Sequence, residues 1–196
     1  LAERAFGAAK EFSHCAVLDT TDGFGLGVLV DGRLLEGKSG YAGEIGHVTV
    51  ERNGKRCGCG NVGCVETVAT DLAFAGRVSE AVGANVSVED AIQRLQSGEP
   101  EAEQAARETL EFLAIGVANV INVFDPDAVL IHSGFLRSVP SQIDQLRALT
   151  ERHALGPSFA DCKILHARST KLQGAFSAVI DSLLNDLGPM VDNVSL

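Results

Sequence analysis

No apolar run in this 196-residue sequence approaches the roughly 20 residues that are needed to cross a lipid bilayer. Its start, LAERAFGAAKEF, also lacks the basic stretch followed by an apolar stretch that marks a secretory signal. These two absences predict a soluble, cytoplasmic protein without a membrane partner.

Basic residues are scarce as well, with 16 Lys and Arg against 26 Asp and Glu, which gives a formal net charge of −10. Such an acidic chain binds phosphate backbones poorly by itself. If DNA is a partner, we expect another segment of the protein to hold it. The first residue is Leu1 and the only methionine is Met190, so we expect an N-terminal part of the protein to precede this chain.

The hydrophobic content of 45% is sufficient for the core of one ordinary domain. Short apolar stretches alternate with longer helical patterns, which is typical of βαβ units and of a parallel or mixed sheet. We expect strands over residues 15–21, 27–35, 47–51, 128–134 and 162–167. We expect helices over residues 1–14, 64–82, 87 or 89 onward, 101–124, 141–153 and 171–187.

The five cysteines divide into two groups. Cys15 and Cys162 each lie in an apolar stretch, where a cysteine usually acts as a small buried hydrophobic residue. Cys57, Cys59 and Cys64 crowd into eight residues. An odd number of cysteines without regular spacing argues against a disulfide framework, and a tight cluster favours metal binding.

His47 lies ten residues before Cys57 and completes a set of four nitrogen and sulfur ligands, the number and type that structural zinc prefers. Glycines at 58, 60 and 63 favour the unusual backbone conformations that bring thiolates so close in sequence to one metal. The alternative is a reduced, cysteine-rich turn beside an exposed histidine. We predict a Zn²⁺ site made by His47, Cys57, Cys59 and Cys64.

The segments GEIGH at 43–47 and CGCGNVGCVE at 57–66 resemble the signature of the ROK family, which groups repressors, open reading frames and sugar kinases. The resemblance continues through VANVINVFDPDAVLI to LQGAFSAVI. It implies an α/β fold, namely an actin-like, ribonuclease H-like ATPase domain with a mixed sheet flanked by helices and a zinc-binding loop. Residues 1–196 would then be the C-terminal ROK domain, with sugar bound in a cleft between two domains.

By this resemblance, Glu44, His47 and Glu66 match the sugar-binding positions of the family. Carboxylates and imidazole suit that role because they form several directed hydrogen bonds with hydroxyl groups. His47 would bind zinc through one ring nitrogen and meet a sugar hydroxyl with the other. The alternatives are a solvated loop carboxylate for Glu44 and an acid favoured by a helix N-terminus for Glu66.

Two departures separate the sequence from the kinases of the family. Where kinases have a Gly-Thr-Gly turn that holds nucleotide phosphate, this chain has Thr21, Asp22 and Gly23. An acidic side chain repels a triphosphate unless a metal lies between them, although Asp before Gly is also ordinary turn chemistry. A histidine and a serine, in the stretch 131–134, replace glycines near the expected adenosine position.

The catalytic aspartate of the family would lie upstream of Leu1, and no other Asp has a spacing that nominates it as a substitute base. The first hypothesis is therefore a sugar-responsive transcriptional regulator, whose DNA-binding segment precedes this chain. The second is an ATP-dependent sugar kinase that uses ATP and Mg²⁺, and a third is a non-catalytic sugar-binding relic. We expect a homodimer or homotetramer with a small sugar as ligand.

Overall fold

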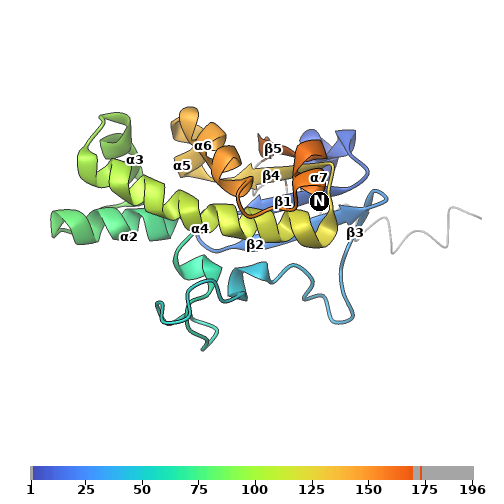
Figure 1. The fold of residues 1–196 in the computed structure, drawn as a ribbon, viewed down its shortest axis with the longest axis horizontal. Helices are drawn as coiled ribbons and strands as arrows, with labels where there is room; N and C mark the ends of the chain where they lie inside the picture. The colour runs from blue at the N-terminus through green and yellow to red at the C-terminus, as the bar shows by residue number, and fades with distance from the viewer. Residues whose placement is uncertain (1, 170–172, 174–196) are drawn as a thin grey trace, which may run out of the picture.

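The computed structural model describes residues 2–169 and 173, and within them a five-stranded mixed sheet forms the centre of the fold (Figure 1). The strand order is β3-β2-β1-β4-β5. Strands β1, β4 and β5 are parallel, and β1 pairs antiparallel with β2, which pairs antiparallel with β3. The strands are β1 Cys15–Asp19, β2 Gly25–Val30, β3 Arg33–Leu34, β4 Ala128–His132 and β5 Lys163–His166. The predicted mixed α/β architecture is confirmed.

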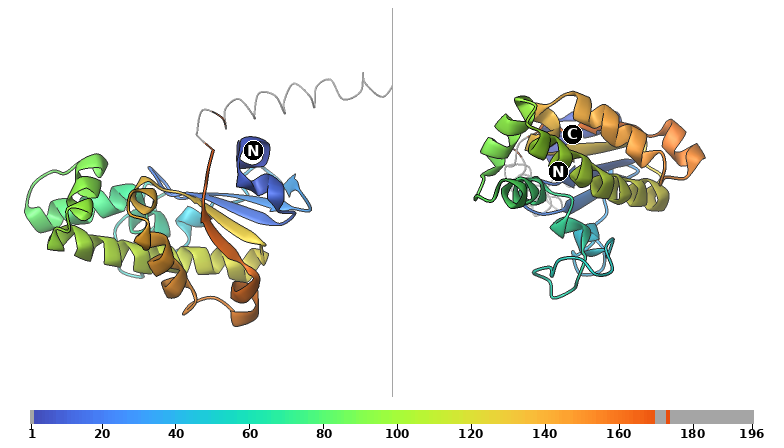
Figure 2. Two further views of the ribbon diagram at one scale, coloured as in Figure 1. Left: turned by 90° about the horizontal axis from the view of Figure 1, so that it is seen from above. Right: turned by 60° about the vertical axis from the view of Figure 1, so that its left-hand side comes forward.

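Helix α4, Pro100–Phe124, packs along one face of the sheet, and the N-terminal helices cover the other (Figure 2). Its apolar residues recur at spacings of three and four, and the buried ones include Leu110, Leu113 and Val117. The helix ends at Asp125, whose φ of 44° is left-handed. The sequence prediction for this helix is confirmed to within one residue at its start.

Helices α2 and α3 lie beside α4, as α6 does, and both begin with a side-chain cap. The Thr70 hydroxyl accepts from the Ala73 N–H at the start of α2, Asp71–Val82, and the Ser87 hydroxyl accepts from the Asp90 N–H at the start of α3, Val88–Gln96. The other helical elements are α1 Ala2–Phe6, η1 Ala8–Glu11, η2 Ile45–His47, η3 Val65–Thr67, α5 Gly134–Ser138, α6 Ser141–Thr150 and α7 Gly156–Asp161.

Cys15 and Cys162 are buried, as predicted. Burial raises the pKa of the Cys15 thiol to about 12 and that of the Cys162 thiol to about 11. Both thiols therefore stay protonated at neutral pH and act as small core side chains.

Several predicted elements are wrong in detail. Residues 47–51 form no strand, because Val48 and Thr49 are exposed and make only an isolated bridge through Thr49 and Cys64. The stretch 27–35 is not one strand: β2 turns at Asp31-Gly32 into β3, with φ values of 51° and 71°. Such paired positive φ values are typical of a tight hairpin turn.

Helix boundaries also differ from the predictions. The predicted helix over 1–14 is broken at Gly7, where a Cβ atom would meet the Glu3 carboxylate. The predicted helix over 64–82 is the short turn η3 followed by α2, and the predicted strand over 128–134 ends at His132. Ser133 instead caps α5. The predicted helix over 171–187 lies outside the described residues, apart from residue 173.

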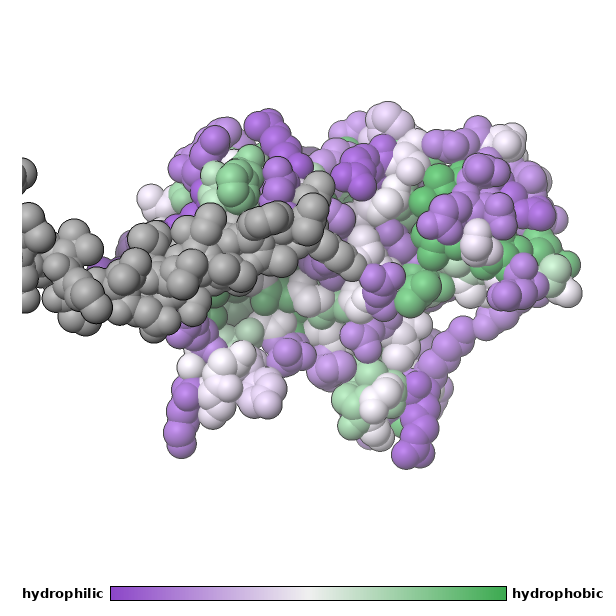
Figure 3. Space-filling view, turned by 180° about the vertical axis from the view of Figure 1, so that it is seen from behind, coloured by the Kyte–Doolittle hydropathy of each residue, from purple (hydrophilic) through white to green (hydrophobic). Residues whose placement is uncertain are grey.

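Among the described residues, no helix is long and apolar enough to cross a membrane. Seen from behind, the molecule has a mainly hydrophilic surface with apolar areas between the polar ones (Figure 3).

Candidate functional site

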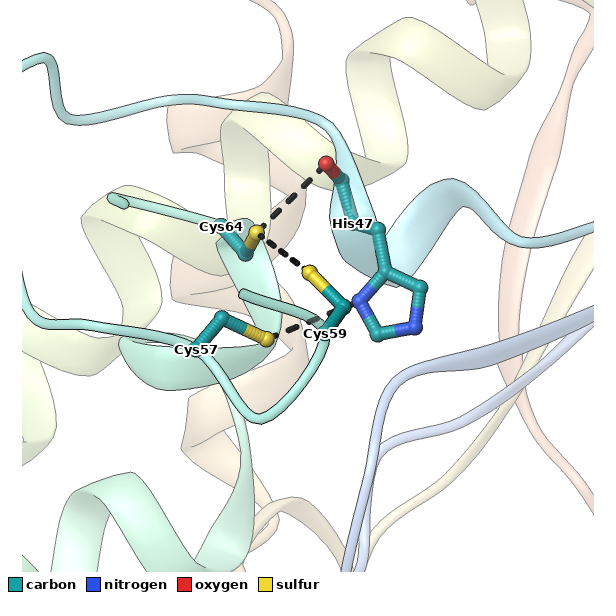
Figure 4. A group of neighbouring side chains, drawn as sticks. All are labelled: His47, Cys57, Cys59 and Cys64. Carbon is teal, nitrogen blue, oxygen red and sulfur yellow. Dashed lines mark hydrogen bonds between the residues drawn. The ribbon is translucent and has the colours of Figure 1, made fainter. Parts of the chain in front are cut away.

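The four predicted metal ligands come together in a segment that projects from the body of the fold, below the sheet in Figure 1. His47 ends η2, Cys57 and Cys59 lie in the following loop, and Cys64 directly precedes η3. Their ligand atoms all lie within 4.8 Å of one another. Figure 4 shows the three sulfur atoms and the imidazole ring turned toward a common centre.

The distances in this cluster fit a tetrahedral metal. Cys59 Sγ lies 3.8 Å from Cys64 Sγ, and Cys57 Sγ lies 3.6 Å from His47 Nδ1. A tetrahedral zinc ion with Zn–S bonds of about 2.3 Å and a Zn–N bond of about 2.0 Å separates two sulfur ligands by about 3.8 Å, and sulfur from nitrogen by about 3.5 Å. The residues therefore fit zinc in type, number and spacing.

The thiols of the cluster differ in pKa. Burial raises the pKa of the Cys64 thiol to about 11, whereas the backbone N–H of Asn61 lowers the pKa of the exposed Cys59 thiol. Lys55, which lies two residues before Cys57, forms an ion pair with Glu80 of α2 at 2.7 Å. A metal ion would supply the positive charge that lets a buried thiol bind as a thiolate.

Glycine shapes the backbone around the cysteines. Gly63 has a φ of 75°, and a Cβ atom there would lie 1.6 Å from the Glu51 carbonyl oxygen. Gly60 has a φ of 96°. Gly58 lies in open space and has no positive φ, so the predicted need for glycine holds at two of the three positions.

The three predicted sugar-binding residues adjoin this cluster. His47 Nε2 faces Glu44 Oε2 at 3.5 Å, while Nδ1 of the same ring faces the cysteines. Glu66 Oε1 accepts from Cys57 Sγ at 3.6 Å, and Oε2 accepts from the backbone N–H of Phe24 at 3.3 Å. One imidazole and two carboxylates thus border the metal ligands, with groups suited to hydroxyl recognition.

The turn with Thr21, Asp22 and Gly23 lies next to Glu66, since a Cβ atom on Gly23 would be 3.1 Å from Glu66 Oε2. Thr21 donates through its backbone N–H and its hydroxyl to Asp19 Oδ1, at 3.1 and 2.7 Å, and Asp22 is exposed. The residues at the expected phosphate position therefore lie next to Glu66, one of the expected sugar-binding residues.

Asp71 was missed by sequence reasoning. Its carboxylate is only 3% exposed and accepts from the Ser133 hydroxyl and the Gly134 N–H, both at 2.6 Å. Burial raises the pKa of Asp71 against the opposing effect of these hydrogen bonds. The buried Asp71 carboxylate thus binds the residues that directly follow β4. No local sequence pattern predicts this contact, because 62 residues separate Asp71 from Ser133.

The chain is similar to known proteins of one family. The fold is shared with sugar kinases and regulators: a ROK hexokinase from Thermus thermophilus superposes with a TM-score of 0.76 and 30% identity, over 85% of this chain and 57% of that one. The ROK family model matches residues 1–181, and the chain belongs to the ROK family.

Regulators are among the most similar proteins. The xylose repressor of Bacillus subtilis (strain 168) is 30% identical over 186 residues, which is 93% of this chain and 48% of the repressor. A ROK family transcriptional regulator, a homologue of the E. coli Mlc protein, superposes with a TM-score of 0.79 and 30% identity, over 88% of this chain and 46% of that one. The chain therefore spans about half the length of these regulators.

Proposed function

We propose that this chain is the sugar-binding part of a ROK transcriptional regulator, and that Glu44, His47 and Glu66 bind the sugar. The observation that carries the proposal is the grouping of these three side chains around one metal-ligand cluster, while acidic side chains occupy the expected nucleotide positions. The similarity to a xylose repressor supports the same class.

The nucleotide positions argue for a regulator over a kinase. Asp22 places an exposed acid in the turn where a phosphate would lie, and like charges repel there. The hydroxyl of Ser133 and the N–H of Gly134 already donate to the Asp71 carboxylate, so neither is open to a nucleotide without loss of that contact. We propose that the full-length protein does not depend on ATP.

We further propose that His47, Cys57, Cys59 and Cys64 hold a structural Zn²⁺. The 3.8 Å and 3.6 Å separations support this ligand set. A metal at Nδ1 would fix the orientation of the imidazole and leave Nε2 directed toward Glu44 and a sugar hydroxyl. The metal supplies rigidity in this arrangement, and the side chains supply the recognition.

A sugar that contacts Glu44 and Glu66 would also contact the domain expected upstream, and so would bias the angle between the two. In a cytoplasmic homodimer or homotetramer, that angle sets the spacing of the DNA-reading segments. The net charge of −10 supports a DNA contact made elsewhere in the protein.

Calorimetric titration of the full-length protein with D-xylose, D-glucose and N-acetyl-D-glucosamine tests the sugar proposal. One sugar should bind saturably, and Glu66→Ala should weaken binding by about tenfold or more, because it removes a charged hydrogen-bond acceptor. Glu36→Ala is the matched control, since Glu36 is exposed in the neighbouring loop. Equal affinities in both variants would contradict the assignment of Glu66.

Metal analysis tests the zinc proposal. About one zinc per chain is expected, and His47→Asn should lower both zinc content and sugar affinity. His153→Asn, at an exposed position, should change neither. Normal sugar affinity in a zinc-free protein would refute the coupling between the two sites.

The similarity to a ROK hexokinase keeps a sugar kinase as the second candidate. A kinase would bring ATP, Mg²⁺ and a catalytic aspartate from outside this chain. Titration of the full-length protein with a non-hydrolysable ATP analogue, in the presence of sugar and Mg²⁺, separates the two. Saturable binding would favour the kinase, and no binding would favour the regulator.

A further inference from the structure

Phe24 links the core of the fold to the candidate sugar site. It lies directly after the turn with Asp22 and Gly23, its side chain is only 4% exposed, and it belongs to the main hydrophobic core. Its backbone N–H donates to Glu66 Oε2 at 3.3 Å. A buried core residue therefore contacts the half-buried Glu66 carboxylate directly.

Gly116, in the buried side of α4, leaves the space that the Phe24 ring needs. A Cβ atom on Gly116 would lie 2.8 Å from Phe24 Cζ and 3.4 Å from Val65 Cγ2. Both neighbours of Gly116 are connected to Glu66. The backbone N–H of Phe24 donates to the Glu66 carboxylate, and Val65 directly precedes Glu66 in the chain. The absence of a side chain at Gly116 thus lets both Phe24 and Val65 pack against α4 in the positions that hold Glu66.

The segment before His47 also confines Phe24. A Cβ atom on Gly46 would lie 2.4 Å from the Phe24 carbonyl oxygen and 3.0 Å from its Cβ atom. Gly46 directly precedes His47, so the backbone of Phe24 lies against the segment that carries the imidazole. A push on the ring from α4 therefore moves the turn and Glu66, since a tightly packed interior leaves little room to absorb it.

We propose that Gly116 and Phe24 are positioning residues for sugar recognition, which hold the Glu66 carboxylate in place without touching the sugar. The inference rests on the proposed sugar-binding function. It also gives α4 a role in affinity, because the packing of this helix against the Phe24 ring sets the direction of the half-buried Glu66 carboxylate.

The test compares two glycine-to-alanine variants of the full-length protein. In Gly116→Ala, the Phe24 amide hydrogen should exchange about tenfold faster, and the sugar that binds best among xylose, glucose and N-acetylglucosamine should bind about tenfold more weakly. Zinc content should not change, because the atoms nearest to a Cβ atom on Gly116 belong to Phe24 and Val65 and to none of the four ligands. Gly76→Ala is the matched control: Gly76 also lies in a helix, and a Cβ atom there meets nothing within 4 Å.

Rescue distinguishes positioning from general damage. Leucine lacks the ring atom that a Gly116 methyl would strike, so Gly116→Ala combined with Phe24→Leu should recover most of the sugar affinity. If Gly116→Ala does not fold, Phe24→Leu alone decides: without the added methyl group it leaves a gap beside Gly116, which should speed exchange of the residue-24 amide and weaken sugar binding.

Unchanged amide exchange and unchanged affinity in Gly116→Ala would overturn the inference, as would an equal loss in Gly76→Ala. If none of the three sugars binds the wild-type protein, the proposed function fails. The amide exchange at position 24 still decides whether α4 positions Glu66, so the two failures are distinguishable.

Discussion

The body of the fold and the site segment, residues 35–70, are held together in different ways. In the body, most apolar side chains of α4 and the sheet are almost completely excluded from water. The site segment contains short turns and isolated bridges, and Tyr41 and Val48 are among its exposed apolar residues. Burial stabilises the body, whereas the segment depends on a few polar contacts, glycine clearance and, as we propose, a metal.

Truncation in the body should have the largest effect on stability. Leu113 of α4 is 1% exposed, and Leu113→Ala removes buried contacts and leaves a cavity. We expect a loss of about 3 kcal/mol in the free energy of unfolding, measured by urea denaturation. The site should be lost only when the body unfolds.

Val123 provides the control within the same helix, because its side chain is 70% exposed. Val123→Ala should change the free energy of unfolding by less than about 0.5 kcal/mol. If Leu113→Ala instead weakened metal binding in a protein that is still folded, the body and the segment would be less independent than the comparison implies.

Backbone substitution in the site segment should have the next largest effect, and a local one. Alanine at Gly63 would combine a left-handed φ with a contact to the Glu51 carbonyl, which we expect to cost about 2–3 kcal/mol of local stability. Gly63→Ala should therefore lose metal while the urea midpoint of the body changes little. Gly60→Ala has the same kind of φ but open space, so it should retain most of the metal. Equal metal loss in both would show that strain alone dominates.

The same division explains which parts of the fold the sequence could predict. The 3.6-residue periodicity of α4 reports burial directly, and the predicted 101–124 agrees with Pro100–Phe124. The alternation in 47–51 resembles that of a strand, but the backbone N–H groups of Val50 and Val65 donate to the carbonyls of Gly63 and Val48 instead of to a strand of the sheet. The hairpin turn at Asp31-Gly32 carried a recognisable signal, since Asp-Gly is typical of such turns.

The candidate site divides in a similar manner. The Cys and His ligands lie close in sequence, so their spacing predicted that they would meet, and they do. The contacts of Glu66 with Phe24, 42 residues away, and of Asp71 with Ser133, 62 residues away, depend on how α2, α4 and the sheet pack. Single-sequence patterns carry no information on such distant pairs.

A buried acid in the body offers a smaller, pH-dependent test. Burial acts to raise the pKa of Glu3, but hydrogen bonds with Ser169, Ala8 and Arg168 outweigh it and hold the pKa below its usual value. A lowered pKa in the folded state stabilises the protein above the pKa of the unfolded chain, and this stabilisation is lost as pH falls.

Glu3→Gln should therefore cost about 1.5–2 kcal/mol at pH 7, and the difference from wild type should shrink as pH falls below about 4. Urea denaturation at pH 7, 5, 4 and 3 measures it, with the exposed Glu36→Gln as control. A difference that grows toward acid pH would contradict the assigned direction.

The smallest effect is expected where the two regions are tied by an ion pair at the surface. Lys55 of the site segment lies 2.7 Å from Glu80 of α2, and the side chains are 58% and 66% exposed. Solvent screens such a pair, so Lys55→Ala should change the free energy of unfolding very little, and even less in high salt. A double-mutant cycle with Glu80→Ala, followed by urea denaturation and zinc analysis, measures the coupling. A clearly measurable coupling between Lys55 and Glu80, or zinc loss in Lys55→Ala alone, would contradict this expectation. Either result would mean that the ion pair is a structural support through which the body holds the metal segment in place.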